Sequence, residues 1–221
     1  MLQYLLQRFL PDRGANILDV GCGTGHHLLF VRRLGYQHVQ GQDLSAVAIA
    51  FCRQLGLRDI VQSDASEMPF AAGQFDALLV ADVLEHLPDE AAALQEFWRV
   101  LKPGGVVLFT VPAFSFLWSH HDEVLHHYRR YRAADFVRLA SAHHFGLADW
   151  SYFFCAILPA VVAYRYVAKM FHFDRTSDLE ATAEPFNTIL KLVSSMETRL
   201  FKYVHRLPFG TSLAVVLRKS S

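Results

Sequence analysis

The sequence predicts an α/β fold: a seven-stranded, mostly parallel sheet with helices on both faces and a helical insertion before the last strand. The first observation is that short apolar runs alternate with helical patterns along the 221 residues, as in parallel sheets. The second is composition, since 52% apolar and 19% charged residues suit a large core and argue against disorder. The third is the long stretch at residues 155–210, which shows only helical patterns.

The expected strands are short, mostly apolar runs of the kind that a parallel sheet buries on both faces. In chain order they span residues 16–20, 38–42, 59–62, 75–81, 106–111, 148–154 and 212–218. A tight turn is expected at residues 102–105, immediately before the fifth strand, because the segment reads Lys-Pro-Gly-Gly.

The expected helices are recognised by the residues that begin or end them. They span residues 2–10, 26–34, 45–55, 89–101 and 133–144. Pro11 closes the first helix, and Gly35 suits the C-terminal cap of the second. Ser45 and Asp89 suit the N-caps of the third and fourth, and Gly146 is expected to end the fifth.

We expect a single domain over residues 1–221, in which residues 155–210 form a helical cap between the last two strands. Lys plus Arg and Asp plus Glu number 21 each, so nothing in the net charge favours a nucleic-acid partner. Cys22, Cys52 and Cys155 are not spaced like metal ligands, which favours reduced thiols in a cytoplasmic protein. No signal-peptide pattern opens the sequence.

The strongest local signal is residues 17–25, which read Ile-Leu-Asp-Val-Gly-Cys-Gly-Thr-Gly. This segment follows an expected strand and opens an expected helix, the context of a nucleotide-binding loop. Gly21, Gly23 and Gly25 allow a sharp turn and the close approach of a ligand. The last two glycines are two residues apart rather than three, which disfavours a nicotinamide dinucleotide. Cys22 is expected to pack as a small residue, not to act as a nucleophile.

A carboxylate lies at the end of each of the first four expected strands. They are Asp19, Asp43, Asp64 and Asp82. Open α/β sheets bind ligands at the carboxyl edge of their strands, so four acids at this edge predict a binding site. Asp43 follows the glycine turn by about 20 residues, where a carboxylate can accept hydrogen bonds from both hydroxyls of a ribose. Any one of these residues alone is equally suited to capping a helix.

Five stretches, in this order and spacing, resemble the class I S-adenosylmethionine-dependent methyltransferases, whose sheet is Rossmann-like. They are residues 17–25, 41–45 (Gly-Gln-Asp-Leu-Ser), 75–78 (Phe-Asp-Ala-Leu), 83–87 (Val-Leu-Glu-His-Leu) and 99–105 (Arg-Val-Leu-Lys-Pro-Gly-Gly). Residues 117–122, 127–131 and 207–212 are similar to a largely uncharacterised bacterial subgroup of that family. Members of the subgroup usually begin with an aromatic- and arginine-rich helix; here either the cofactor lid is shorter or residues 2–10 take that role.

The resemblance implies that S-adenosylmethionine is the cofactor. The implied cofactor-binding residues are Asp19, Gly21, Cys22, Gly23, Gly25, Asp43, Leu44, Asp64, Ala65 and Asp82. The glycine turn and the first carboxylate would hold the methionine part. Asp43 would bind the ribose with Leu44 against the adenine, and Asp64 with Ala65 would meet the adenine edge. Asp82 would face the methionine end, near the methyl group.

Histidines provide the candidate bases, because an oxygen acceptor must lose a proton and imidazole titrates near neutral pH. We predict His86, after the fourth strand, and His120 and His121, after the fifth, as catalytic residues; a capping role is the alternative for His86. His126 and His127 follow in the same loop. These residue types can bind metals, but the resemblance indicates none, so we expect no metal.

Residues 118–131 are predicted to form a substrate-facing loop. Arg129 and Arg130 are suited to hold an anionic acceptor such as a phosphate or carboxylate. The alternative is an ion pair with Asp122 or Glu123. The predicted substrate-binding residues are Trp118, Tyr128, Arg129, Arg130 and Tyr131.

The region 153–203 combines a very apolar run with an amphipathic one. It is suited to line a pocket for a lipophilic acceptor, to contact a membrane interface, to form a homodimer surface, or to pack on the sheet as a helical hairpin. A cytoplasmic protein is expected, with peripheral contact at the inner face of the membrane as an open alternative. The longest uncharged apolar run, residues 152–164, is too short to span a bilayer.

These observations predict an enzyme that transfers a methyl group from S-adenosylmethionine to an oxygen atom of a small acceptor, lipophilic or anionic. Two other classes remain open. One is a non-catalytic S-adenosylmethionine-binding or scaffold protein. The other, with less support, is a nicotinamide-dependent oxidoreductase.

Overall fold

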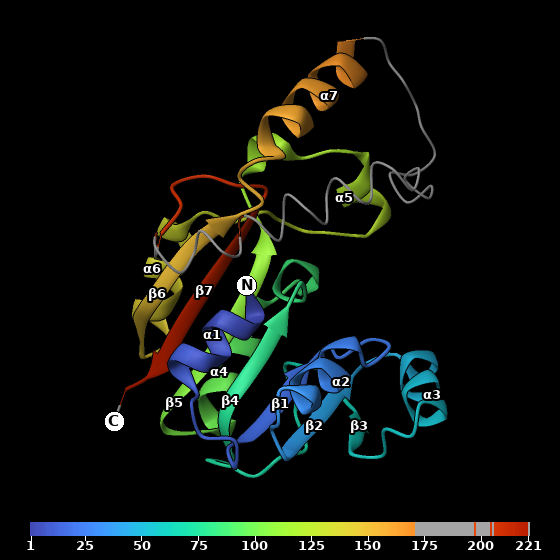
Figure 1. The fold of residues 1–221 in the computed structure, drawn as a ribbon, viewed down its shortest axis with the longest axis vertical. Coiled ribbons are helices and arrows are strands. Elements are labelled where there is room, and N and C mark those ends of the chain that lie inside the picture. The colour runs from blue at the N-terminus through green and yellow to red at the C-terminus, as the bar shows by residue number, and fades with distance from the viewer. Residues whose placement is uncertain (171–196, 198–203, 205, 221) are drawn as a thin grey trace.

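The structure, a computed structural model, describes residues 1–170, 197, 204 and 206–220 and contains one seven-stranded sheet (Figure 1). The strands are β1 (Asn16–Val20), β2 (His38–Asp43), β3 (Ile60–Gln62), β4 (Phe75–Ala81), β5 (Leu101–Pro112), β6 (Phe145–Phe153) and β7 (Ser212–Lys219). Their order across the sheet is β3-β2-β1-β4-β5-β7-β6. The first five are parallel, and β7 is antiparallel to both of its neighbours. The predicted fold class is confirmed.

Helices cover both faces of the sheet, as the alternating pattern predicts. The described helices are α1 (Leu2–Phe9), α2 (His26–Arg33), α3 (Ala46–Gln54), α4 (Glu90–Val100), α5 (His120–Val124), α6 (Ala133–Ala142) and α7 (Leu158–Met170), with short 3₁₀ turns η1 (Leu84–His86) and η2 (Ser115–Leu117). Helices α1, α2 and α3 pack in one hydrophobic cluster, and α4 and α6 pack in the other.

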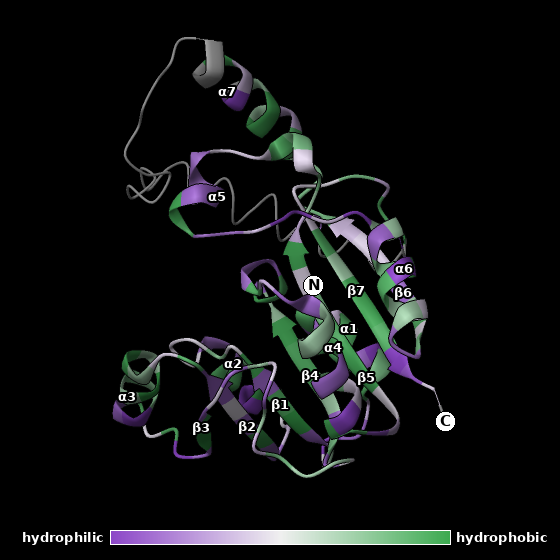
Figure 2. Cartoon of the chain, turned by 180° about the vertical axis from the view of Figure 1, so that it is seen from behind, coloured by the Kyte–Doolittle hydropathy of each residue, from purple (hydrophilic) through white to green (hydrophobic). Residues whose placement is uncertain are grey.

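Each core cluster takes alternate residues of the central strands, which Figure 2 colours as hydrophobic. In β4, Leu79 packs with the α1–α3 cluster, and Leu78 packs with the α4–α6 cluster. Both side chains are fully buried. Successive side chains of a strand point to opposite faces, so a strand that is apolar throughout requires cover on both sides.

Two predicted boundaries are wrong. β5 begins at Leu101, not at residue 106, and the expected turn at 102–105 is a bulge within the strand: Phe75 pairs with Leu101 but Ala77 pairs with Val106. Gly146 does not end the preceding helix, because α6 stops at Ala142 and Gly146 pairs with Arg218 inside β6. In both places the pairing partner on a distant strand decides the structure.

The predicted cap leaves the sheet and returns to it at the carboxyl edge of β5, since the last residue of β6, Phe153, pairs with the first of β7, Ser212. Helix α7 projects beyond this edge (Figure 1). The rest of the predicted 155–210 cap falls largely on residues 171–196, 198–203 and 205, which lie outside the described residues. Within the described residues, every helix is too short or too polar to cross a bilayer.

Candidate functional site

The glycine turn between β1 and α2 is built for close backbone approach. Gly21, Gly23 and Gly25 have φ of 66°, 51° and 82°, values that L-residues with a side chain rarely adopt. A Cβ on Gly21 would lie 2.5 Å from Val83 Cγ2, and one on Gly25 would lie 2.5 Å from Leu57 Cδ1. A Cβ on Gly23 would meet nothing within 4 Å. Gly23 therefore faces open space, while the other two pack tightly on their neighbours.

Asp19, near the carboxyl end of β1, is a buried carboxyl group with unusual surroundings. Its exposed fraction is 1%, and neither Oδ1 nor Oδ2 has a hydrogen-bond partner among the described residues. Burial, with a contribution from Asp43, raises the pKa of Asp19 to about 8. Buried polar groups in native structures are normally hydrogen-bonded, so this carboxyl fits a site that is completed by a ligand with donors or positive charge.

Asp43 ties the glycine turn to the start of α3. Its Oδ2 accepts a hydrogen bond from the N–H of Gly23 at 2.8 Å, and its Oδ1 accepts one from the N–H of Ser45 at 2.8 Å. Gln42, which the sequence analysis overlooked, is 2% exposed and accepts from the N–H of Gly21 at 3.3 Å while donating to the carbonyl of Ser63. Because β2 reads His-Val-Gln-Gly-Gln-Asp, Gln42 is one of several polar residues in the strand, and no sequence signal singled it out.

The remaining predicted cofactor residues lie around this edge in different environments. Leu44 is 65% exposed, as a residue that contacts a ligand face would be. Asp64 Oδ1 accepts hydrogen bonds from the hydroxyl and N–H of Ser66, which lower the pKa of Asp64, and Ala65 is buried in the core. The Cys22 side chain packs toward Gly41 in the core, where burial raises its thiol pKa, so only its backbone could meet a ligand. The ligand contacts of these residues remain predictions.

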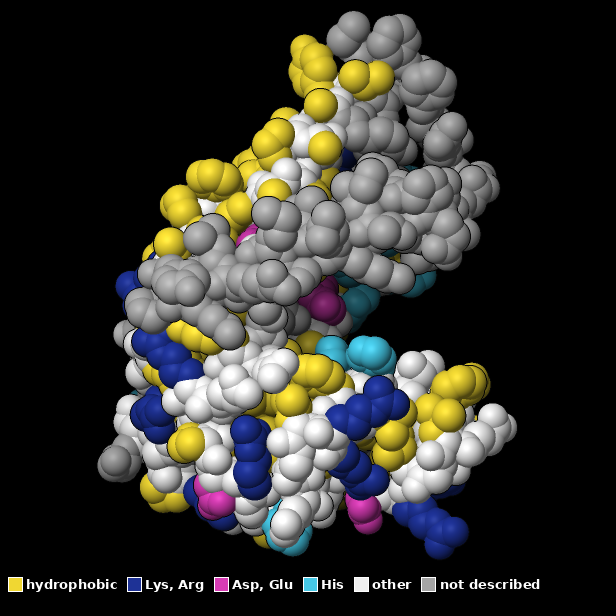
Figure 3. Space-filling view, in the orientation of Figure 1, with side chains coloured by type: hydrophobic (Ala, Val, Ile, Leu, Met, Phe, Trp, Pro, Cys, Tyr) yellow, Lys and Arg dark blue, Asp and Glu magenta, His cyan; other side chains and the backbone are white. Residues whose placement is uncertain are grey.

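A cavity of about 400 Å³ lies at the carboxyl edge of the sheet, beyond β4 and β5. Its lining residues are Asp82, Glu85, His86, Pro112, Leu117, His121, Leu125, His127, Arg130, Val161, Arg165, Thr211 and Ser212. Figure 3 shows histidine side chains gathered beside the hollow on this face of the molecule. Val83, which contacts the Gly21 position, directly follows Asp82, so the cavity adjoins the glycine turn.

A buried ionic cluster holds the loop on one side of this cavity. The fully buried Asp122 accepts from Arg130 Nε at 2.7 Å and Nη2 at 3.0 Å, and from the N–H of Ser119 at 2.8 Å. His127 Nδ1 lies 3.0 Å from Asp122 Oδ1. The pKa of Asp122 is lowered because the hydrogen bonds and charge of Arg130 outweigh burial. The predicted alternative of an ion pair between Arg130 and Asp122 is present.

Carboxyl and imidazole groups face each other across the cavity. Burial raises the pKa of Asp82 to about 6 and, with the charge of Asp82, that of Glu85 to about 8. Glu85 is 1% exposed. The rings of His86 and His127 meet edge to face, with centroids 4.6 Å apart, and partial desolvation, together with the charge of His127, lowers the pKa of His86. Sequence reasoning did not select Glu85, although an acid within the apolar run 83–87 is a signal for a buried carboxylate.

Of the predicted catalytic and substrate-binding residues, His86, His121 and Arg130 line the cavity. His120 is exposed, 3.4 Å from Glu123, and Trp118 and Tyr128 are 38% and 59% exposed. None of these three is among the residues that line the described cavity.

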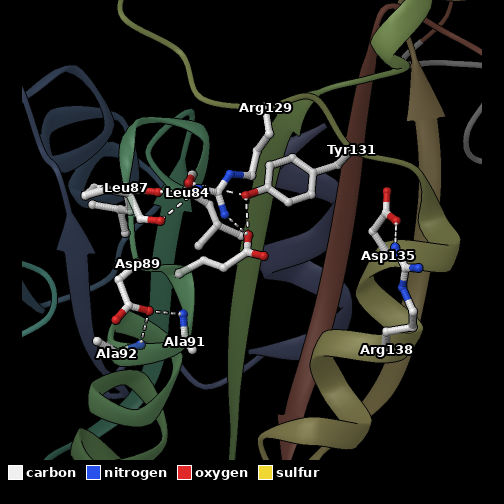
Figure 4. Close-up of polar contacts among 11 residues, drawn as sticks. Leu84, Leu87, Asp89, Ala91, Ala92, Arg129, Tyr131, Asp135 and Arg138 are labelled. Atoms are coloured by element: carbon white, nitrogen blue, oxygen red, sulfur yellow. Dashed lines mark hydrogen bonds and ion pairs between the residues drawn. The ribbon is translucent and has the colours of Figure 1, made fainter.

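Arg129 and Tyr131 are also not among the residues that line the described cavity, and Figure 4 shows their side chains meeting beside Leu84 and Leu87. Arg129 donates to the carbonyls of Leu87 and Pro88 and lies 3.2 Å from Glu90 Oε2. The Tyr131 hydroxyl donates to the same Glu90 Oε2 at 2.7 Å, and the residue is 2% exposed. These contacts fix the loop after α5 to the start of α4. They occupy the groups that the prediction assigned to substrate.

Comparisons with known proteins find similarity to methyltransferases. Residues 18–109 match a family model described as "Methyltransferase domain". The chain is 34% identical over 148 residues to the trans-aconitate 2-methyltransferase of Deinococcus radiodurans, covering 65% of this chain and 54% of that protein. It is 42% identical over 110 residues to the ubiquinone biosynthesis O-methyltransferase of Xanthomonas oryzae pv. oryzae, a match that covers 47% of this chain and 45% of that protein.

A similar solved structure is that of Haemonchus contortus phosphoethanolamine N-methyltransferase 2 in complex with S-adenosyl-L-methionine. Its TM-score is 0.65 at 19% identity, and the match covers 99% of this chain and 52% of that one. At this identity the likeness shows the fold. The chain spans about half the length of the curated relatives it matches.

Proposed function

Because this chain belongs to the class I S-adenosylmethionine-dependent methyltransferase family, we propose that it transfers the sulfonium methyl group to an oxygen atom of a small acceptor. The observation that carries the proposal is the pairing of two sites at one sheet edge. The first is the glycine turn with the unpartnered carboxylate of Asp19. The second is the adjoining cavity, lined by Asp82 and several imidazoles.

The residues present fit the cofactor. When bound, S-adenosylmethionine supplies a methyl group that its sulfonium already activates for displacement. Asp19 is buried, and its oxygens have no hydrogen-bond partner among the residues that the structure describes, so it would offer a negative charge to the ammonium of the methionine part. Gly23 leaves room for a ligand against the turn, and Asp43 presents its carboxylate beside it for the ribose hydroxyls.

The cavity residues would orient the acceptor and receive its proton. As the new oxygen–carbon bond forms, the carbon–sulfur bond breaks, its electron pair stays on sulfur, and the hydroxyl proton must leave. His86 and His121 line the cavity, and an unprotonated imidazole there would accept that proton. Helix α7 contributes Val161 and Arg165 to the same cavity, which helps to exclude water from it.

The size and lining of the cavity favour a small acceptor with an apolar part. Pro112, Leu117, Leu125 and Val161 provide apolar surface, and about 400 Å³ suits a metabolite rather than a macromolecule. Two curated relatives are named as O-methyltransferases, of ubiquinone biosynthesis and of malonyl-[acyl-carrier protein]. They support oxygen as the accepting atom. The acceptor is proposed to carry a hydroxyl or carboxylate oxygen.

The test begins with calorimetric binding of S-adenosylmethionine and of S-adenosylhomocysteine, followed by turnover with a panel of phenols, carboxylic acids and lipophilic alcohols. Micromolar or tighter binding, with release of S-adenosylhomocysteine that depends on one acceptor class, supports the proposal. Binding without turnover for any acceptor favours a non-catalytic binding protein. Binding of a nicotinamide nucleotide in place of S-adenosylmethionine would overturn the proposal in favour of an oxidoreductase.

We further propose that the region 153–203 contacts a membrane surface or a second copy of the chain, in a cytoplasmic protein. Support comes from the described part of α7, where Val162, Tyr166 and Val167 are 38%, 70% and 46% exposed. Exposed large apolar side chains on one helix are typical of interaction surfaces. Flotation with vesicles and measurement of the solution mass distinguish the two alternatives.

A further inference from the structure

The cavity contains a cluster of three side chains, of which the proposed methyl transfer uses only His86. Glu85, His86 and His127 each offer one ligand atom, and these atoms all lie within 4.8 Å of one another. Two residues come from η1 after β4, and the third comes from the loop after α5, about forty positions away. The tertiary fold therefore gathers two imidazoles and one carboxylate around a single point.

Glu85 is the member that is hardest to explain without a ligand. It is 1% exposed, it lines the cavity, and its Oε2 has no hydrogen-bond partner among the described residues. A buried carboxylate oxygen without a partner destabilises the folded state, because it has lost its hydrogen bonds to water and has formed none with the protein. A cation bound at this oxygen would supply the missing interaction.

His127 is oriented as metal-bound histidines usually are. Its Nδ1 lies 3.0 Å from Oδ1 of Asp122, which Arg130 in turn holds with two hydrogen bonds. A proton on Nδ1, donated to this carboxylate, leaves Nε2 as the unprotonated atom that can bind a metal. Carboxylates that accept from the outer nitrogen of a ligand histidine fix its tautomer and ring orientation in this way.

The three ligand atoms lie farther apart than the ligands of a bound zinc ion. Ligand atoms of tetrahedral zinc, bonded at 2.0–2.1 Å, lie roughly 3.4 Å apart, so the three atoms must close by up to about 1.4 Å. His86 is exposed and can rotate.

We propose that Glu85, His86 and His127 bind one divalent transition-metal ion, with zinc the best match to two imidazoles and a carboxylate. Three protein ligands leave a fourth position, and the residues line the acceptor cavity, so that position faces an acceptor oxygen. An ion there lowers the pKa of a bound hydroxyl and orients it for attack. This role rests on the proposed methyl transfer; the binding of the ion does not. His121 would then take the proton, since it lines the cavity outside the cluster.

Zinc binding is measured by calorimetry and by metal content after dialysis, with the untagged full chain and no methyl donor. One Zn²⁺ per chain is expected, with Kd about 1 µM or tighter and much weaker binding of Mg²⁺. Glu85→Gln and His86→Gln should each weaken zinc binding at least about tenfold. His120→Gln is the matched control, because His120, the first residue of α5, is exposed and outside the cluster. Circular dichroism verifies that each variant is folded.

Absence of zinc binding, or equal binding by Glu85→Gln, His86→Gln and the parent chain, overturns the metal site. The outcome for methyl transfer is separate. If the chain binds zinc through this cluster but methylates no acceptor, the metal site is supported and the proposed function is overturned. If the chain binds no zinc and its turnover is the same before and after treatment with a metal chelator, the proposed function is supported and the metal site is overturned.

Discussion

Replacing Asp19 by asparagine should stabilise the ligand-free protein at neutral and alkaline pH while abolishing S-adenosylmethionine binding. The carboxyl is 1% exposed and has no partner for either oxygen among the described residues, so its charged form is strongly disfavoured in the folded state. Asparagine has nearly the same shape and carries no charge. The substitution therefore isolates the cost of holding this charge in place for a ligand.

The size of the effect follows from the pKa of Asp19, which burial raises from 3.8 to about 8. Below pH 3.8 the carboxyl is protonated in both folded and unfolded chains, and its titration contributes nothing. Between these values only the unfolded chain loses its proton, so folding becomes less favourable by up to about 1.4 kcal/mol per pH unit. Above about pH 8 the penalty is constant. Relaxation and water entry reduce the full difference, and we expect a gain of about 2–3 kcal/mol for Asp19→Asn at pH 8.

The assay is urea denaturation of the parent chain and the variant at pH 5, 6, 7, 8 and 9. The difference in free energy of unfolding should increase from pH 5 to pH 8 and then level off. Near pH 8 the variant should melt about 4–12 °C higher, given 2–4 °C per kcal/mol for a chain of this size. Calorimetry on the same samples should show that the variant no longer binds S-adenosylmethionine.

Asp64→Asn is the matched control, an exposed carboxylate at the same sheet edge whose pKa is lowered by Ser66. The hydrogen bonds from Ser66 contribute their full stability at any pH above the pKa that Asp64 has in the unfolded chain. That contribution is lost only when the pH falls low enough to protonate Asp64 in the folded chain. Its substitution should cost less than about 1 kcal/mol, with no change between pH 5 and pH 9. A difference for Asp19→Asn that does not vary with pH would refute the burial argument.

Four further outcomes are expected. Gly23→Ala should lower the free energy of unfolding by about 1–2 kcal/mol, because the φ of Gly23 is 51°, but the variant should still fold. The new Cβ would enter the open space beside the turn, so we expect cofactor binding to weaken at least tenfold. Calorimetry, after circular dichroism has shown that the variant is folded, tests this. Asp122→Asn should cost about 3 kcal/mol in urea denaturation by leaving Arg130 buried without its carboxylate, whereas an unchanged midpoint would contradict the ionic cluster. His121→Gln should lower kcat at pH 7 by about 100-fold with little change in KM or melting temperature, and an unchanged kcat would remove His121 as the base. If the region 153–203 binds membranes, the chain should float with anionic vesicles, and Tyr166→Ser should weaken this; recovery as a dimer without flotation would favour the second copy instead.

The carboxyl edge of the sheet shows which features of the site local sequence patterns can predict. The glycine turn was predictable because three closely spaced glycines after an apolar run have few structural explanations. The acids Asp19, Asp43, Asp64 and Asp82 were predictable as a group, since parallel strands end at one edge. Their individual environments were not: Asp19 is buried and unpartnered, whereas Asp43 is bound to two backbone N–H groups.

The loop after β5 shows what local sequence patterns cannot predict, namely the partners of its side chains. From the sequence, the arginines and tyrosines of residues 127–131 are equally suited to bind substrate or to hold the loop in place. The structure shows Arg129 and Tyr131 bound to Glu90 and places His127 on Asp122, beside Glu85. These partners come from α4, α5 and η1, and no spacing within the loop specifies them.

The sequence by itself determined the α/β class, the seven strands and the position of the cofactor turn, because hydrophobic period, glycine and cap residues act over a few neighbouring positions. Only the tertiary structure decided that β7 inserts antiparallel between β5 and β6, and which histidines reach the cavity. Those features depend on residues far apart in the chain. Their packing, burial and charge pairing exist only once the sheet has assembled.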